Sequence, residues 1–264
     1  MPLRAHLVEL RRRVFLAAIG VVVGAVIGWF LYDPVFTALQ RPIELVAAER
    51  DDLITLNFAG IATSFDMQVK VSFFLGIILS SPWWLYQFWA FVTPGLTRRE
   101  RGYAISFVAV AVPLFLAGAF MAWWVLPNAV RLLTEFTPTG ATNIIDAQTY
   151  LGFVMRIMLA FGIAFLLPII MVALNFAGIG TAATWRKGWR WAVLLSFVFA
   201  AVVTPTPDAI TMLAVAIPMS ALYFLALGVC VLHDRRVDRK RVAAGLPRLD
   251  GTMADGPDAA AGTA

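Results

Sequence analysis

Two isolated carboxylates are the side chains of this 264-residue chain that are most suited to bind a ligand. Glu9 lies in the segment HLVELRRR at residues 6–13, and Glu100 lies in TRRER at residues 97–101. A carboxylate accepts two parallel hydrogen bonds from a planar guanidinium, so two such acids could bind two arginines. Each acid also has a plainer interpretation. Glu9 can pair with Arg13 one helical turn later, and Glu100 can complete a capping box with Thr97.

The sequence lacks the residue patterns of common catalytic sites. Its two histidines, His6 and His233, are far apart in sequence, and Cys230 has no second cysteine to pair with. There is no H-E-x-x-H zinc motif and no G-x-x-x-x-G-K-[ST] phosphate loop. The serines in the apolar segments have no histidine beside them, and Lys70 lies at the end of its segment. We therefore expect no enzyme activity, no catalytic residues, no metal and no cofactor.

Composition places the chain in a membrane. It is 61% hydrophobic and 14% charged, with a mean hydropathy of +0.81, whereas soluble domains are about 45–50% apolar and about 25% charged. A membrane-crossing helix needs about 20 mostly apolar residues. Six segments come near that length, although the fifth is short: residues 14–32, 69–92, 102–126, 150–176, 189–203 and 209–232.

These segments predict an all-α polytopic membrane protein with six transmembrane helices, of which the fifth and sixth are short. Leu3, Leu7, Leu10 and Val14 recur at helical spacing, which predicts a short amphipathic helix before the first span. The outer segment at residues 33–68 is expected to form short helices. Residues 1–249 form a single membrane domain in this interpretation, and residues 250–264 form a disordered cytoplasmic tail.

The basic residues predict the orientation. Six spans leave both termini on one side, and that side carries 16 of the 21 lysines and arginines. By the positive-inside rule both termini are cytoplasmic, so the basic pI reflects topology and not nucleic-acid binding. The residues on this side are Arg4, Arg11, Arg12, Arg13, Arg98, Arg99, Arg101, Arg186, Lys187, Arg190, Arg235, Arg236, Arg239, Lys240, Arg241 and Arg248.

An ordered set of motifs resembles the TatC family, the multispanning component of the twin-arginine (Sec-independent) protein translocase. The resemblance covers about residues 3–232 and is specific because the motifs occur together and in order. They are His6-Leu7-x-Glu9-Leu10-Arg11-x-Arg13; Ser81-Pro82-x-x-Leu85-Tyr86-Gln87-x-Trp89-x-Phe91-x-x-Pro94-x-Leu96 with Glu100-Arg101; Phe161-Gly162-x-x-Phe165-x-x-Pro168; and Thr204-Pro205-x-Pro207-Asp208 with Ala216-Ile217-Pro218-Met219.

The resemblance implies a receptor and core scaffold that binds twin-arginine signal peptides. Such a protein supports export of folded proteins across the bacterial cytoplasmic membrane, driven by the proton-motive force. By this likeness Glu9 and Glu100 recognise the paired arginines, and Arg11, Arg13 and Phe91 support the site. A small-solute secondary transporter is the alternative. It predicts paired broken helices with polar ligands at the membrane midplane, and the proline breaks of this chain lack such ligands.

The resemblance also implies an outer face, partners and a cupped shape. Pro42, Phe65 and Asp208 match outer-face positions, although Asp208 is also a natural N-cap for the sixth helix. The short fifth and sixth helices resemble the docking surface for the single-span proteins TatA and TatB, and self-association is expected in the active complex, within the lipid bilayer. The chain departs from the family where Leu166 or Leu167 stands for a frequent glutamate, and where Met212 stands for a glutamine of some relatives.

Overall fold

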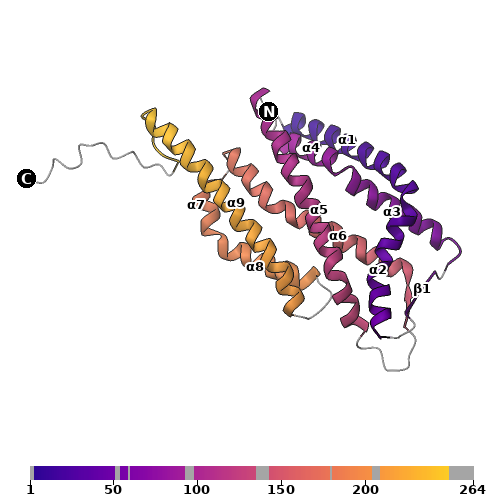
Figure 1. Ribbon diagram of the computed structural model, residues 1–264. Coiled ribbons are helices and arrows are strands. Elements are labelled where there is room, and N and C mark those ends of the chain that lie inside the picture. The colour runs from indigo at the N-terminus through magenta and orange to yellow at the C-terminus, as the bar shows by residue number, and fades with distance from the viewer. Residues whose placement is uncertain are drawn as a thin grey trace, which may run out of the picture.

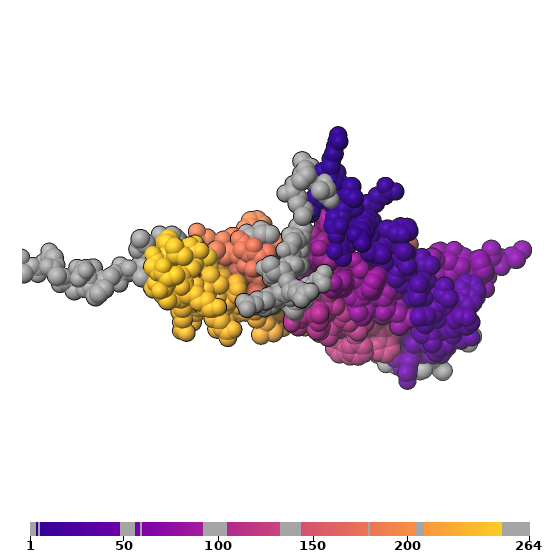
Figure 2. Space-filling model, turned by 90° about the horizontal axis from the view of Figure 1, so that it is seen from above, coloured from indigo at the N-terminus to yellow at the C-terminus, as the bar shows by residue number. Residues whose placement is uncertain are grey.

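The computed structural model describes residues 3–50, 54–58, 60–92, 98–134, 143–178, 180–203 and 209–249. Within these ranges the chain is almost entirely helical (Figure 1). The elements are α1 (Leu3–Phe30), α2 (Tyr32–Arg50), β1 (Ile54–Asn57), α3 (Thr63–Leu79), α4 (Ser81–Val92), α5 (Arg98–Thr134), β2 (Asn143–Asp146), α6 (Ala147–Phe176), α7 (Ala182–Lys187), α8 (Trp189–Val203) and α9 (Ala209–Ala243). Seen from above in Figure 2, the molecule is elongated, and the yellow end of α9 lies well away from the indigo α1.

Several helices have the length and composition of membrane spans. In the described part of the chain α1, α5, α6 and α9 are long and apolar enough to cross a bilayer, and the bent pair α3 and α4 could form a fifth crossing. The apolar helix α8 has 15 residues and is shorter than these spans, whereas α9 has 35 residues, so the expectation of a short sixth helix is wrong. Helix starts at residues 189 and 209 and helix ends at residues 176 and 203 coincide with the predicted bounds. The all-helical membrane class is therefore confirmed, with four or five candidate spans.

Two predicted elements are divided differently in the structure, and α1, α5, α6 and α9 each extend beyond the predicted segments. The segment at residues 69–92 was expected to be one helix, but α3 and α4 meet at an angle of 59° at Ser80. Pro82 has no backbone N–H to continue the hydrogen bonds of α3, whereas in the first turn of α4 that N–H is not needed. The prediction of a separate amphipathic helix before residue 14 is also wrong. Residues 3–30 form one helix, because the arginines after Leu10 are good helix formers and no breaker precedes Val14.

Glycines allow α1 and α3 to pack closely. Gly20, Gly24 and Gly28 follow one another at intervals of four on α1, so they lie on one face of the helix. A Cβ added to Gly24 would lie 2.8 Å from the carbonyl oxygen of Gly76 on α3, and one added to Gly76 would lie 2.5 Å from the carbonyl oxygen of Val21. This is the small-residue packing used between membrane helices, where lipid gives no hydrophobic drive for association.

The end of the molecule formed by α2 and the start of α6 has its own apolar core. Leu39 and Ile43 of α2 pack with Met67 of α3 and Leu151 of α6. The hydroxyl of Tyr150 donates a hydrogen bond to the carbonyl oxygen of Leu39 across 3.2 Å. The outer segment was expected to form short helices, but it contains the single 19-residue helix α2, followed by β1 and the start of α3. The parallel pairing of β1 with β2, with Ile54 opposite Asn143, is a feature that the sequence did not predict.

Asp146 begins α6 as its N-cap. Its carboxylate accepts hydrogen bonds from the backbone N–H and the hydroxyl of Thr149, across 2.8 and 2.7 Å. Both hydrogen bonds hold the pKa of the Asp146 carboxyl below its usual value, and the bond from the Thr149 hydroxyl has the larger effect. The start of α6 is thus fixed three residues before the predicted span begins.

A polar cluster joins α6, α7 and α9 at the far end of α6. One carboxylate oxygen of Asp234 accepts a hydrogen bond from Nδ2 of Asn175 across 2.8 Å, and the other accepts one from the backbone N–H of Ala182 across 2.6 Å. The ring of His233 stacks on Phe176, with centroids 4.0 Å apart, and its Nδ1 lies 3.1 Å from Oδ1 of Asn175. Asn175 is buried, so these contacts satisfy polar groups that would otherwise be costly.

Candidate functional site

The N-terminal half of α1 packs antiparallel along α4. Three residues of α4, spaced by four and therefore on one face, contact successive turns of α1. The contacts are a hydrogen bond from Nε1 of Trp83 to the carbonyl oxygen of Leu16 (2.8 Å), one from Nη1 of Arg13 to Oε1 of Gln87 (3.0 Å), and stacking of His6 on Phe91 with ring centroids 4.6 Å apart. This α1–α4 interface contains three of the residues predicted for the signal-peptide site, Glu9, Arg13 and Phe91.

Arg13 connects Glu9 to a buried amide. Its Nε lies 2.7 Å from Oε1 of Glu9, while its Nη1 bonds to Gln87, which is 3% exposed. The plainer interpretation of Glu9, an ion pair with Arg13 one helical turn later, is therefore confirmed. The Glu9 side chain remains 35% exposed, so a carboxylate held in a fixed orientation is open to solvent.

The structure brings Glu9, Arg13 and Phe91 to one interface but does not bring Arg11 there. Arg11 is exposed, and as it follows Glu9 by two residues it lies on another side of α1. Glu100 belongs to the first turn of α5, since that helix begins at Arg98. The side chain of Glu100 and all of Thr97 lie outside the described residues. In Figure 1 α5 begins at the same end of the molecule as α1.

Gln87 is the site residue that sequence reasoning missed. It appeared in the family motif without a role, yet it is the buried acceptor that fixes the Arg13 guanidinium. A signal was present, because an amide interrupts the apolar and aromatic run SPWWLYQFWAFV of α4. A buried amide needs hydrogen-bond partners, so its position predicts a polar contact but not the residue that makes it.

The predicted outer-face residues lie apart from this interface. Pro42 is fully buried within α2. Phe65 is 63% exposed near the start of α3, where its ring meets the edge of Trp29 with centroids 6.0 Å apart. Close to Phe65, Asp66 pairs with Lys70 at 2.6 Å and accepts a hydrogen bond from Nε2 of Gln148 on α6. Asp208 lies outside the described residues.

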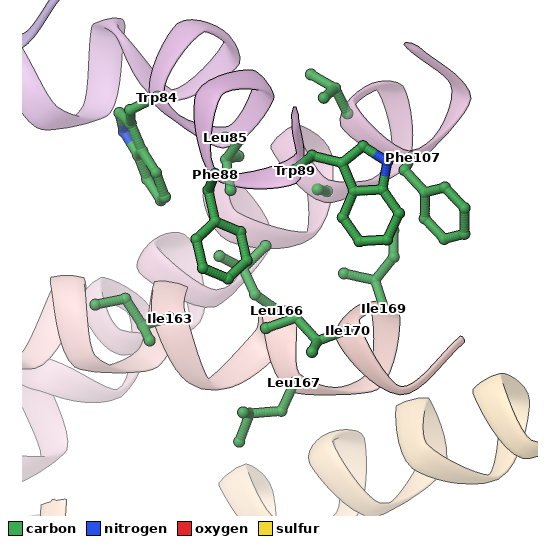
Figure 3. Close-up of a pocket in the computed structure, with 12 residues that line it drawn as sticks. Trp84, Leu85, Phe88, Trp89, Phe107, Ile163, Leu166, Leu167, Ile169 and Ile170 are labelled. Carbon is green, nitrogen blue, oxygen red and sulfur yellow. The ribbon is translucent and has the colours of Figure 1, made fainter. Parts of the chain in front are cut away.

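An apolar groove runs beside the α1–α4 interface, between α4, α5 and α6. Its volume is about 240 Å³, and its walls are almost wholly hydrocarbon and aromatic. In Figure 3, Phe88 of α4 points toward Leu166 and Ile170 of α6, and Trp89 lies beside Phe107 of α5. We call this the α4–α6 groove. Leu167 is 59% exposed on its wall, and Leu166 is buried, so neither of these two positions places a charge here.

The motifs and the helical arrangement can now be compared with known proteins. Residues 5–218 match the family described as "Sec-independent protein translocase protein (TatC)". The chain belongs to the TatC family. It is 58% identical to the Sec-independent protein translocase protein TatC of Xylanimonas cellulosilytica over 244 residues, which cover 92% of this chain and 88% of that relative. It is 35% identical to TatC of Rothia mucilaginosa over 241 residues, which cover 91% and 82%.

A solved TatC structure has the same arrangement of helices. The crystal structure of the twin arginine translocase receptor TatC superposes with a TM-score of 0.68 at 31% identity, covering 86% of this chain and 98% of that chain. As a TatC protein, this chain is a translocase component of the receptor type, and a small-solute transporter is not supported.

Proposed function

We propose that this TatC chain recognises paired-arginine signal peptides through the carboxylates of Glu9 and Glu100. The observation that carries the proposal is the fixed Glu9. Arg13, tied to buried Gln87, holds one oxygen of the Glu9 carboxylate while the side chain stays 35% exposed. Orienting the carboxylate in advance lowers the entropy that a ligand must lose on binding. Phe91 supports this arrangement through its contact with His6.

The chemistry of the site favours arginine over lysine in the ligand. A carboxylate has about four lone-pair positions, and Arg13 occupies only part of them, so a second guanidinium can still bind. Guanidinium presents two parallel N–H groups to a carboxylate, whereas the ammonium of lysine is a single point charge. Glu100, in the first turn of α5, supplies the second carboxylate. Arg11, exposed on another side of α1, is included in the proposed site by the family likeness alone.

Two arginine contacts alone give weak binding. Each charge-assisted hydrogen bond contributes about 1.5–3 kcal/mol, so two give about 3–6 kcal/mol, whereas micromolar affinity needs about 8 kcal/mol. The remainder comes from the apolar segment of the signal peptide. The α4–α6 groove is suited to it, because Trp84, Phe88 and Trp89 line the groove on the helix that also carries Gln87 and Phe91.

The topology of the proposal has six crossings and cytoplasmic termini. The bent pair α3 and α4 forms the second crossing and α8 the fifth. The 15 residues of α8 span about 22 Å against a hydrocarbon core of about 30 Å, so α8 thins the bilayer of the bacterial cytoplasmic membrane locally. Basic residues beyond the ends of the apolar segments set the orientation. Several copies of the chain associate in the active complex.

The remaining functional surfaces are assigned by the family likeness. The faces of α8 and α9 dock the single-span proteins TatA and TatB. Pro42, Phe65 and Asp208 serve export on the outer face, and Phe65 is exposed enough to contact a partner there. Export of a twin-arginine reporter in cells that carry Phe65→Ala tests this assignment. Lower export with an unchanged protein level supports it, and normal export contradicts it.

Binding of a synthetic signal peptide to the purified protein tests the central proposal. We expect Glu9→Gln and Glu100→Gln each to weaken binding of the twin-arginine peptide by about 10-fold to 100-fold, the loss of one charge-assisted contact. The matched control is Glu44→Gln, which removes an exposed acid of α2, and it should leave affinity unchanged. A twin-lysine peptide should bind weakly to the wild type, and the two glutamine variants should lose that discrimination. Unchanged affinity in both variants would sink the proposal.

A further inference from the structure

A second apolar groove lies between α5, α6 and α9, next to the α4–α6 groove, with which it shares Phe107 and Ile169. Its volume is about 450 Å³, within the range of about 300–1,000 Å³ typical of small-molecule sites. Its walls come from α5 and α9, and its floor comes from α6. The residues are Ser106, Phe107, Val110 and Leu114 of α5, Pro168, Ile169, Val172 and Phe176 of α6, and Leu222, Leu225, Ala226 and Val229 of α9. We call it the α5–α9 groove.

The groove is shaped for a chain and not for a compact ligand. Its wall residues on α9 include pairs spaced by three and by four, so they form a stripe along one face of the helix, and the wall residues on α5 do the same. Leu225 is 68% exposed and Val110 is 50% exposed, so the groove opens outward along its length. Almost all of its lining is apolar.

One end of the α5–α9 groove changes from apolar to basic. Phe176 forms the last part of its floor, and the ring of His233 stacks on Phe176. Arg236 and Lys240 follow Val229 by seven and eleven residues, spacings that return to the same face of α9. The helix is unbroken to Ala243, so the apolar stripe continues directly into these exposed basic side chains.

The two acidic residues in this part of α9 do not offset the positive charge at the groove, because Asp238 lies on the opposite side of the helix and Asp234 is already hydrogen-bonded. Asp238 follows Val229 by nine residues and therefore lies on the opposite side of the helix, where it accepts the backbone N–H of Leu249. Asp234 accepts hydrogen bonds from Asn175 and from the backbone of Ala182. The mouth of the groove thus carries positive charge, about 10 Å beyond its last apolar contact at Val229.

We propose that the α5–α9 groove binds an acidic phospholipid, with an acyl chain along the groove and the phosphate at Arg236 and Lys240. Basic pockets between membrane helices on the cytoplasmic side are typical sites for acidic headgroups, because local charge adds to the apolar contact of the chain. Charge complementarity selects this occupant, since the helix of a partner protein would need no pair of basic side chains in line with the groove. The site goes beyond the proposed receptor function and does not depend on Glu9 or Glu100.

Lipid retention by the purified, delipidated protein tests the proposal. The probes are phosphatidylglycerol and phosphatidylcholine with identical acyl chains, and native mass spectrometry counts the bound molecules. We expect one phosphatidylglycerol to be retained in preference to phosphatidylcholine and to raise the Tm in detergent. Arg236→Gln with Lys240→Gln should weaken retention about tenfold or more, because each basic side chain near an anionic headgroup gives roughly a fivefold gain in affinity.

Two matched controls separate this site from general surface charge and from misfolding. Arg235→Gln with Arg239→Gln makes the same charge change on other faces of α9 and should leave retention unchanged. Val110→Trp fills the groove and should abolish retention, whereas Leu116→Trp, also exposed on α5 but outside the groove, should not. If Val110→Trp lowers the Tm of the lipid-free protein, Leu225→Trp fills the groove from α9 instead.

Three outcomes would overturn the proposal. The first is equal retention of the two lipids, and the second is an equal loss in the Arg235 and Arg239 control. The third is unchanged phosphatidylglycerol retention when the groove is filled. If filling the groove then abolishes copurification of a single-span partner, the groove is a protein-docking surface. Signal-peptide affinity, measured in parallel, reports separately on the receptor function.

Discussion

Nη1 of Arg13 donates a hydrogen bond to Oε1 of Gln87 across 3.0 Å and so joins two helices whose residues are 74 positions apart in sequence. Nε of the same guanidinium lies 2.7 Å from Glu9. A buried amide of α4 therefore determines the orientation of a carboxylate on α1 that is about one third exposed. The geometry of the proposed arginine site depends on this contact as much as on Glu9.

The first prediction concerns Gln87. Gln87→Leu keeps the size of the side chain but removes the acceptor for Arg13, and hydrogen bonds to charged groups contribute about 1.5–3 kcal/mol. We expect the free energy of unfolding to fall by about that amount, and signal-peptide affinity to fall because Glu9 loses its fixed orientation. Denaturant unfolding in detergent and peptide titration measure the two effects. Gln68→Leu on α3 is the control, and an unchanged affinity in Gln87→Leu would contradict the proposed role.

The second prediction separates the two arginines near Glu9. Arg13→Gln breaks both the pair with Glu9 and the contact with Gln87, so it should lower the Tm and weaken signal-peptide binding severalfold. Arg11→Gln makes the same charge change at an exposed position on another side of α1, and it should leave the Tm unchanged. Thermal unfolding and peptide titration of the two variants provide the comparison. Equal Tm losses would show that net charge, and not the α1–α4 interface, sets the effect.

The third prediction tests the close packing of α1 on α3. Gly24→Leu places a side chain where an added Cβ already lies 2.8 Å from the carbonyl oxygen of Gly76. Overpacking of this kind typically costs about 1–3 kcal/mol, and here the contact is backbone that cannot rotate away. Val23→Leu is the matched control, because Val23 is 56% exposed on the same helix. Thermal unfolding in detergent should show a lower Tm for Gly24→Leu alone, and equal Tm values would contradict the packing.

The fourth prediction concerns the polar cluster of α6, α7 and α9. Asp234→Ala removes the acceptor of the backbone N–H of Ala182 and one of the two acceptors of Asn175 Nδ2, which also donates to the carbonyl oxygen of Gly180 across 2.9 Å. Donors left without partners cost about 1–3 kcal/mol each, so we expect a clear loss of stability. Asp238→Ala removes an acid whose hydrogen bond is exposed, and its effect should be within about 0.5 kcal/mol. Hydrogen exchange at Ala182 should become faster in the first variant, and an unchanged rate would show that this contact is not formed.

Local composition alone determined the class of this protein and many of its helix boundaries. Apolar length predicted the end of α6 at Phe176 and both ends of α8, because a bilayer selects for uninterrupted apolar runs whatever the rest of the chain does. Glu9 and its pair with Arg13 were also predictable, since four residues make one helical turn. The ordered motifs were enough to point to the TatC family, which the comparisons confirm.

Tertiary structure decided the features that depend on contacts between distant segments. The role of Gln87, the parallel pairing of β1 with β2 and the seating of Gly24 against Gly76 each join residues more than 50 positions apart. The 59° bend at Ser80 gives α4 a direction that brings its face against α1. A sequence pattern predicts which face of a helix is apolar or polar. The segment that packs against that face depends on the tertiary structure of the whole chain.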